Sequence, residues 1–202
     1  MAIEQKVRQV EALFNRLDIE ITAFKTETSL HCLIGCGQCC SKPDIDASSL
    51  EFLPWAFYLF LNGKAEESLL ELQNSSIKNC HIFRPLALLE EYNGSCSNYR
   101  YRGLICRLFG YAASRDKYGK LRLATCKIIK ENQLENFNAT EEAISKGLYV
   151  PIFTDYYMQL AQIDYRMGTA VLPINEALKR AIEEVLHYYA YRPFPGDLEN
   201  IA

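Results

Sequence analysis

The stretch HCLIGCGQCC, residues 31–40, places four thiols within ten positions of the chain. The other four cysteines follow at Cys80, Cys96, Cys106 and Cys126, so all eight fall between residues 32 and 126 of a 202-residue chain. Between Cys80 and Cys126 the sequence is rich in Gly, Arg and Tyr and has no sustained helical period. We therefore expect a central irregular segment, about residues 30–128, that is held in shape through its cysteines.

Composition bears on what those cysteines do. Apolar residues make up 49% of the chain, enough to fill a core, while the longest apolar run, residues 52–61, is about half of what crosses a bilayer. The amino terminus lacks the basic start and apolar block of a secretory signal, so we expect a cytoplasmic protein with no membrane contact. In a reducing compartment, eight cysteines favour metal binding over disulfides, with free or redox-active thiols as a third alternative.

The spacing of the first four cysteines suggests how they divide. Cys32, Cys36 and Cys39 form a C-x3-C-x2-C loop whose sulfurs can converge, with Gly35 and Gly37 loosening the backbone. Cys40 is adjacent to Cys39, and because neighbouring side chains diverge, the two are expected to reach different metal atoms. The eight thiols then form either two four-sulfur sites or one polynuclear cluster, and their order along the chain leaves the division open.

Two histidines also lie beside cysteines. His31 precedes Cys32 and His81 follows Cys80. A histidine in this position more often supports a neighbouring ligand than replaces it. Neither is included in the expected ligand set.

A strongly basic stretch surrounds the later cysteines. Between Arg100 and Lys130 there are nine basic residues and one acid, a local balance of +8 in a chain whose net charge is −3. Four thiolates around zinc, or around an iron–sulfur cubane, leave about two negative charges, which arginines can offset while donating to sulfur. Arg102 and Arg107 are the candidates for this role. The alternatives are a solvated basic face or an anionic substrate, and the pI of about 5.7 argues against nucleic acid.

The two ends of the chain are expected to be helical. Apolar residues from Ile3 to Phe24 recur at steps of four and three, which predicts one helix over residues 3–28. This heptad seam can pack within its own domain or against a second copy in a homodimer. Residues 138–192 are also expected to be helical, with Asn138 or Thr140 as the first cap, and a hairpin is expected to turn at residues 117–120. The sequence predicts a single mainly α domain with a metal-pinned centre and a small β-hairpin.

CLIGCGQCC, followed later by CSNYRYRGLICRLFGY, resembles the YkgJ-type cysteine-cluster family. That family carries a CxxCxxCC signature, is described as zinc- or iron-chelating, and includes the flagellin lysine-N-methylase of some bacteria. A second family element matches here at Cys96, Tyr99, Arg102, Cys106 and Arg107. The resemblance covers residues 30–128 and implies that all eight cysteines are metal ligands. The chain departs from the family pattern in two places. Three residues separate Cys32 from Cys36, where the signature has two, and Gly103 stands where the family usually has proline.

These observations predict a metal-binding protein whose partners are metal ions. The cofactor is an iron–sulfur cluster or zinc, and the crowded thiols with flanking arginines suit the cluster better. Electron transfer and metal handling are the expected roles. The alternative is an enzyme, either a protein lysine N-methylase or a radical S-adenosylmethionine enzyme, because C-x3-C-x2-C is also the spacing of the latter. No catalytic residue can be assigned from the sequence.

Overall fold

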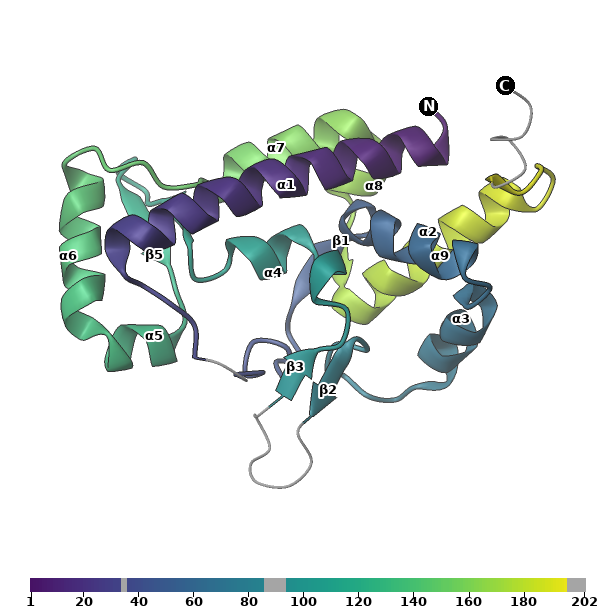
Figure 1. Ribbon diagram of the computed structural model, residues 1–202, viewed down its shortest axis with the longest axis horizontal. Helices are drawn as coiled ribbons and strands as arrows, with labels where there is room; N and C mark the ends of the chain where they lie inside the picture. The colour runs from purple at the N-terminus through teal and green to yellow at the C-terminus, as the bar shows by residue number, and fades with distance from the viewer. Residues whose placement is uncertain (34–35, 86–93, 196–202) are drawn as a thin grey trace.

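A computed structural model describes residues 1–33, 36–85 and 94–195. Helices dominate, and the strands form small two-stranded sheets, which confirms the predicted fold class. The long helix α1 (Ile3–Thr28) spans the molecule beside α7 (Phe153–Ile163), as Figure 1 shows. No helix in the described ranges has the length and apolar character needed to traverse a bilayer.

The heptad seam of α1 is buried inside its own chain. Seam residues from Ile3 to Phe24 are at most 8% exposed. They pack on α2 (Leu53–Leu61), α7 and the short helix α4 (Leu104–Leu108). A homodimer contact through this helix stays a prediction, and it would have to use the opposite face, where Ile19 is 71% exposed.

Among the described residues, the larger of two apolar clusters lies under most of α1, from Ile3 to Ile21. It joins α1 to α2, α3 (Ala65–Asn74) and the carboxy-terminal helix α9 (Ile174–Tyr189). Helix α2 starts where Pro54 is tolerated, in its first turn. A 3-10 turn, η1 (Ser49–Phe52), precedes it, and there Ser48 and Glu51 form a reciprocal capping box.

The second apolar cluster lies under the other end of α1. Phe24 and Leu30 pack there with Phe137 from α6 (Leu134–Ser145), Leu123 from β5 (Leu121–Ala124) and Ile129 from α5 (Lys127–Asn132). In Figure 1, α5, α6 and β5 lie on the left, α2, α3 and α9 lie on the right, and β2 and β3 lie below. Because α1 runs over both clusters, it connects the two ends of the molecule.

In the described parts of the chain, three antiparallel strand pairs complete the architecture. β1 (Asp46–Ser48) pairs with β6 (Val171–Pro173), and β2 (Phe83–Pro85) pairs with β3 (Gly94–Cys96). The predicted hairpin is β4 (Ala112–Arg115) with β5. The central segment therefore contains more regular structure than the sequence analysis expected.

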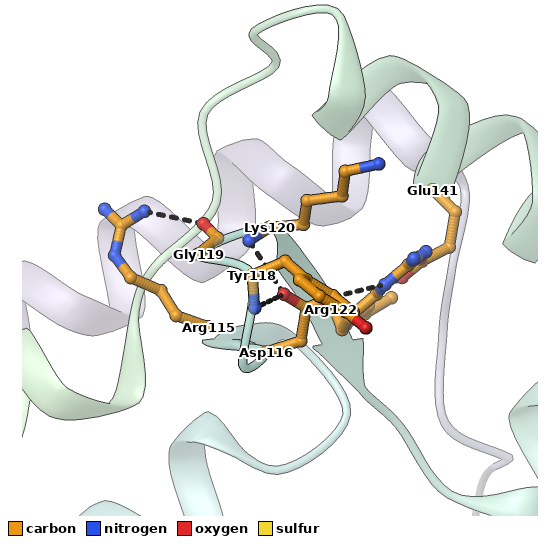
Figure 2. A network of polar contacts seen from close by, with 8 residues as sticks. Arg115, Asp116, Tyr118, Gly119, Lys120, Arg122 and Glu141 are labelled. Atoms are coloured by element: carbon orange, nitrogen blue, oxygen red, sulfur yellow. Dashed lines mark hydrogen bonds and ion pairs between the residues drawn. The ribbon is translucent and has the colours of Figure 1, made fainter.

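The hairpin turns where the sequence predicted, and its tip is held by one carboxylate. Asp116 Oδ1 accepts from the backbone N–H groups of Tyr118 and Lys120 at 2.8 and 3.0 Å, and Gly119 adopts a φ of 77° (Figure 2). Arg122 lies between Asp116 and Glu141 at 3.5 and 3.4 Å. Part of the basic stretch is thus paired locally, on the hairpin itself.

The carboxy-terminal third is helical, but its first boundary differs from the prediction. Helix α6 begins at Leu134, so Asn138 and Thr140 lie inside it and do not cap it. The Thr140 hydroxyl is buried and donates to the Asn136 carbonyl at 2.6 Å. The Thr140 hydroxyl therefore makes its hydrogen bond within the helix, as any helical threonine can.

Asp164 separates α7 from α8 (Tyr165–Thr169) and ties both to the start of α1. Its carboxylate accepts from Met167 N–H at 2.9 Å and pairs with Lys6 Nζ at 2.6 Å, with side chains only 15% and 12% exposed. Burial acts to raise the pKa of Asp164, but Lys6 and the Met167 N–H outweigh it and lower the pKa below its ordinary value.

Replacing this carboxylate should make stability less dependent on pH. Asp164→Asn keeps a capping oxygen but loses the charge, so we expect the free energy of unfolding at pH 7 to fall by about 1 kcal/mol. Because the folded pKa is depressed, this contribution is complete above the ordinary value of 3.8 and disappears as the pH falls through the folded pKa. Urea denaturation at pH 7 and pH 3 measures it, and an equal difference at both pH values would contradict the assignment.

Candidate metal centre

The eight cysteines come from five parts of the fold, and all of them are among the described residues. Four lie on the connection that leaves α1 and descends toward β2 and β3 (Figure 1). Cys80 precedes β2, Cys96 ends β3, Cys106 lies in α4 and Cys126 is the N-cap of α5. All eight are unpaired in this structure.

One set of thiols gathers around the start of the cysteine loop. Its members are Cys32, Cys36, Cys39 and Cys126. Burial raises the pKa of Cys32, and the Cys36 and Cys126 thiols raise it further. For Cys39, burial and then Cys126, Cys32 and Cys36 raise the pKa to about 11. Cys39 thus responds to the three other thiols and Cys32 to two of them, so these cysteines lie in one region of the molecule.

Backbone contacts explain why the distant Cys126 joins this set. Gln133, at the end of α5, accepts from His31 N–H at 3.1 Å and donates to the His31 carbonyl at 2.7 Å. Cys126 occupies the other end of α5, where its sulfur accepts from Ile129 N–H at 3.4 Å. The Tyr111 hydroxyl accepts from Cys32 N–H at 2.8 Å. Helix α5 and Tyr111 therefore fix the start of the loop beside Cys126.

The second set lies beside the β2–β3 pair. Its members are Cys40, Cys80, Cys96 and Cys106. Cys80 N–H donates to the Cys40 carbonyl at 3.2 Å, and Phe83 N–H donates to the Cys80 carbonyl at 2.9 Å. Phe83 is in turn the register partner of Cys96 across the strand pair. Three of the four cysteines are thus joined through neighbouring backbone.

Side-chain electrostatics places Cys106 in the same set. Burial raises the pKa of Cys106 well above its ordinary value, and Cys80 and then Cys40 raise it further. Burial also raises the pKa of Cys40 to about 12, with Cys80 and Cys96 as the next causes and Cys39 after them. Adjacent in sequence, Cys39 and Cys40 therefore face different neighbours.

The Phe83 ring lies between the cysteine loop and the β2–β3 pair. It is 7% exposed. A Cβ built on Gly37 would lie 2.2 Å from Phe83 Cε2, and one built on Gly94 would lie 2.4 Å from the same atom. Gly37, which was predicted to loosen the loop, is instead required for the close approach of an aromatic ring. Gly35 lies outside the described residues.

Adding a methyl group at this position should disturb both the loop and the core. For Gly37→Ala we expect the free energy of unfolding to fall by about 1–3 kcal/mol, because the ring cannot move away from both glycines. Phe83→Leu in the same chain removes the clashing atoms and should recover part of the loss. Urea denaturation of both single variants and the double variant measures this coupling, and strictly additive losses would contradict it.

Arg102 lies where the two sets meet. Its guanidinium acts to lower the pKa of Cys39, Cys40, Cys96 and Cys106, which belong to both sets. The guanidinium stacks 3.7 Å from the centre of the Tyr99 ring, and its Nε is buried without a hydrogen-bond partner in the described residues. A buried donor without an acceptor fits a thiolate or a metal-bound sulfur beside it.

Arg107, the other predicted arginine, is placed differently. It is 5% exposed and pairs with Asp18 of α1. It also donates to the Arg102 carbonyl at 3.0 Å and to the Arg100 carbonyl at 2.6 Å. These contacts dock α4 on α1. Arg107 still acts to lower the pKa of Cys96, after burial and Arg102, so its role toward the cofactor stays a prediction.

The two histidines have other partners. His31 Nδ1 lies 3.0 Å from the Ser29 carbonyl. His81 Nε2 lies 3.4 Å from the Glu71 carboxylate, and its ring packs at 6.4 Å against Trp55. Both rings are engaged on the rim of the cysteine region.

The thiols are neighbours without forming a finished coordination shell. Within residues 1–33, 36–85 and 94–195, no three Cys, His, Asp or Glu side chains are arranged so as to hold a metal ion. Metal–sulfur bonds are about 2.3 Å long, so ligation would draw the sulfurs of each set closer together. Backbone hydrogen bonds hold this loop as a turn, with Cys40 N–H and Ser41 N–H both donating to the Gly37 carbonyl at 2.9 and 3.1 Å, so this approach would fall mainly to the side chains.

Several residues around the thiols gave no sequence signal. Tyr111 contacts Cys32, which is 79 positions away, and Gln133 contacts His31, which is 102 positions away. A local sequence pattern cannot show contacts of such long range. Phe83 contacts Cys80, only a few positions away, but an apolar residue there has no distinctive pattern. Comparisons with protein-family models, with curated proteins and with solved structures found no match.

Proposed function

We propose that the protein binds metal through its eight cysteines, as an iron–sulfur cluster or as zinc. The observation that supports this most is that five separate parts of the fold bring the eight cysteines into one region of the molecule. Thiols at this density gain little from burial, whereas each thiolate bound to metal contributes to folding.

Charge supports the same proposal. Arg102 adds a positive charge between the two sets and has an unused buried donor at Nε. Two other arginines of the basic stretch are engaged elsewhere: Arg107 with Asp18, and Arg122 with Asp116 and Glu141. Arg102 is therefore a candidate to offset the charge of metal-bound thiolates.

Iron–sulfur is favoured over zinc, with electron transfer or metal handling as the role. The adjacent Cys39–Cys40 pair and the resemblance to the YkgJ-type family are compatible with either metal. The unused Arg102 donor favours the cluster, because hydrogen bonds to sulfur tune the potential of a redox centre and give no such benefit to structural zinc.

Anaerobic purification tests the proposal. We expect a coloured protein that contains iron and acid-labile sulfide, measured by visible absorption and elemental analysis. A colourless protein with stoichiometric zinc would contradict the iron–sulfur cluster but support metal binding. A protein with neither metal would end the proposal.

The enzyme alternatives receive no support from the site. A radical S-adenosylmethionine enzyme needs an open fourth iron, yet Cys126 lies as a fourth thiol beside Cys32, Cys36 and Cys39. Incubation with S-adenosylmethionine and a reductant tests this class, and cleavage of the cofactor would revive it. Nothing in the described residues favours lysine methylation.

A further inference from the structure

We propose that a small cavity between α1, α2 and α4 binds the zwitterionic head of an α-amino acid with an apolar side chain. The cavity has a volume of about 90 Å³ and is open on one side. Its fourth wall is the 3-10 turn η2 (Tyr99–Tyr101). None of the residues that line it is a cysteine, so this site is independent of the proposed metal binding.

Arg107 gives the cavity a fixed positive charge. Its side chain is 5% exposed, and its guanidinium carbon lies 4.6 Å from the centre of the Phe14 ring. It is held by its pair with Asp18 and by its bonds to the Arg102 and Arg100 carbonyls, which engage one N–H group on each nitrogen. A guanidinium carries five N–H groups, so each terminal nitrogen keeps a further one, and a carboxylate is the acceptor that suits such a pair.

Two more charged side chains, Arg100 from η2 and Glu11 from α1, line the same cavity. In the part of the chain that the structure describes, neither forms an ion pair with the other or with a third residue. Burial raises the pKa of Tyr101, while Arg100 acts to lower it and Glu11 to raise it, so both charges act on the ring that they flank. Opposite charges that share a cavity without pairing can each bind the complementary end of a zwitterion.

The rest of the wall is apolar and is held in place. Phe14 and the Pro54 ring line the cavity, and the Tyr101 ring stacks on Tyr58 with 4.9 Å between centres. A single water needs about 10–15 Å³ of such space, and a cavity of about 150 Å³ admits benzene. The volume therefore suits the head groups and first carbons of an amino acid. An inorganic anion would use the arginines but neither Glu11 nor this apolar wall.

Leucine and two analogues separate the parts of the site. Leucinamide lacks the carboxylate, and 4-methylpentanoate lacks the ammonium group. We expect leucine to bind the wild-type protein with half-saturation below about 10 mM, and each analogue to bind about tenfold more weakly, because it loses a charged hydrogen bond. Chemical-shift titration of the isotope-labelled full-length protein measures binding, and the backbone amides of Asn15 and Tyr101 should shift, because both residues line the cavity.

Two substitutions test the role of each charge. Arg100→Gln should weaken leucine and 4-methylpentanoate about tenfold and leave leucinamide unchanged, whereas Glu11→Gln should weaken leucine and leucinamide about tenfold and leave 4-methylpentanoate unchanged. Arg115→Gln and Glu27→Gln are the matched controls, since both residues are exposed and neither lines the cavity. Circular dichroism verifies that all four variants keep their helices.

A wild-type protein that shows no saturable binding of leucine, or shifts only outside the cavity, would overturn the proposal. Binding of 4-methylpentanoate as tight as that of leucine would also overturn it, because this result would indicate a simple anion site. Metal content, measured in the same preparations, separates this proposal from the proposed function. Protein without metal that binds leucine would end only the metal proposal, and metal-loaded protein that does not bind leucine would end only this one.

Discussion

Glu51→Ala is expected to lower the free energy of unfolding by about 3–5 kcal/mol. The carboxylate is fully buried and accepts from Ser48 N–H at 2.8 Å, from the Ser48 hydroxyl at 3.1 Å and from Ile105 N–H at 2.9 Å. Burial raises the pKa of Glu51, while these donors act to lower it. Removing the side chain leaves buried donors without acceptors in both η1 and α4, and each carries a desolvation cost.

Urea denaturation of the variant measures this loss. Glu27→Ala serves as the matched control, because Glu27 is exposed near the end of α1 and its replacement should change stability by no more than about 0.5 kcal/mol. Glu51→Gln should fall between the two, since the amide keeps one acceptor oxygen. A Glu51→Ala variant as stable as the control would show that the buried carboxylate does not organise η1 and α4.

Cys36→Ala and Cys106→Ala are expected to lose bound metal and the order of the central segment. The terminal helices should remain partly formed, because α1 and α9, which lie outside the cysteine-rich segment, share most of the larger apolar cluster with α2. The loss follows from the coupling of ligation to folding, and structural zinc sites can supply about 10–16 kcal/mol of apparent binding free energy. Metal content and hydrogen exchange along the chain measure the two effects.

The matched control for these variants is Ser95→Ala. Ser95 is exposed on β3, directly before Cys96, and its hydroxyl is not a metal ligand in the proposal. The Ser95→Ala variant should keep its full metal content and the full protection of the central amides from hydrogen exchange. Unchanged metal in both cysteine variants would contradict the ligand assignment.

Sequence patterns predicted the parts of this fold that depend on local periodicity. The heptad seam of α1 and the turn around Gly119 are both confirmed, because each needs only residues close together in the chain. The predicted start of α6 was wrong because Asn138 and Thr140 favour caps in isolation, while the helix already includes Phe137, which is buried in the second apolar cluster. Short elements such as α4 and α5 were missed, since they depend on distant partners.

The candidate site was predicted by residue type but not by arrangement. Clustered cysteines identified the thiols, yet the division into two neighbouring sets depends on contacts such as His31 with Gln133, which are 102 residues apart. Likewise, Arg102 and Arg107 look equivalent in sequence. Only the position of Asp18 on α1 separates the arginine that docks a helix from the one beside the sulfurs.

The distance along the chain between Cys32 and Cys126 has a consequence for synthesis on the ribosome. At roughly 5–20 residues per second, the first thiol emerges about 5–20 s before the last one. During that interval, the early loop is exposed to oxidants and to competing ions without its full set of partners. The nascent protein would therefore depend on the reducing power of its surroundings, or on an escort, until translation has passed α5.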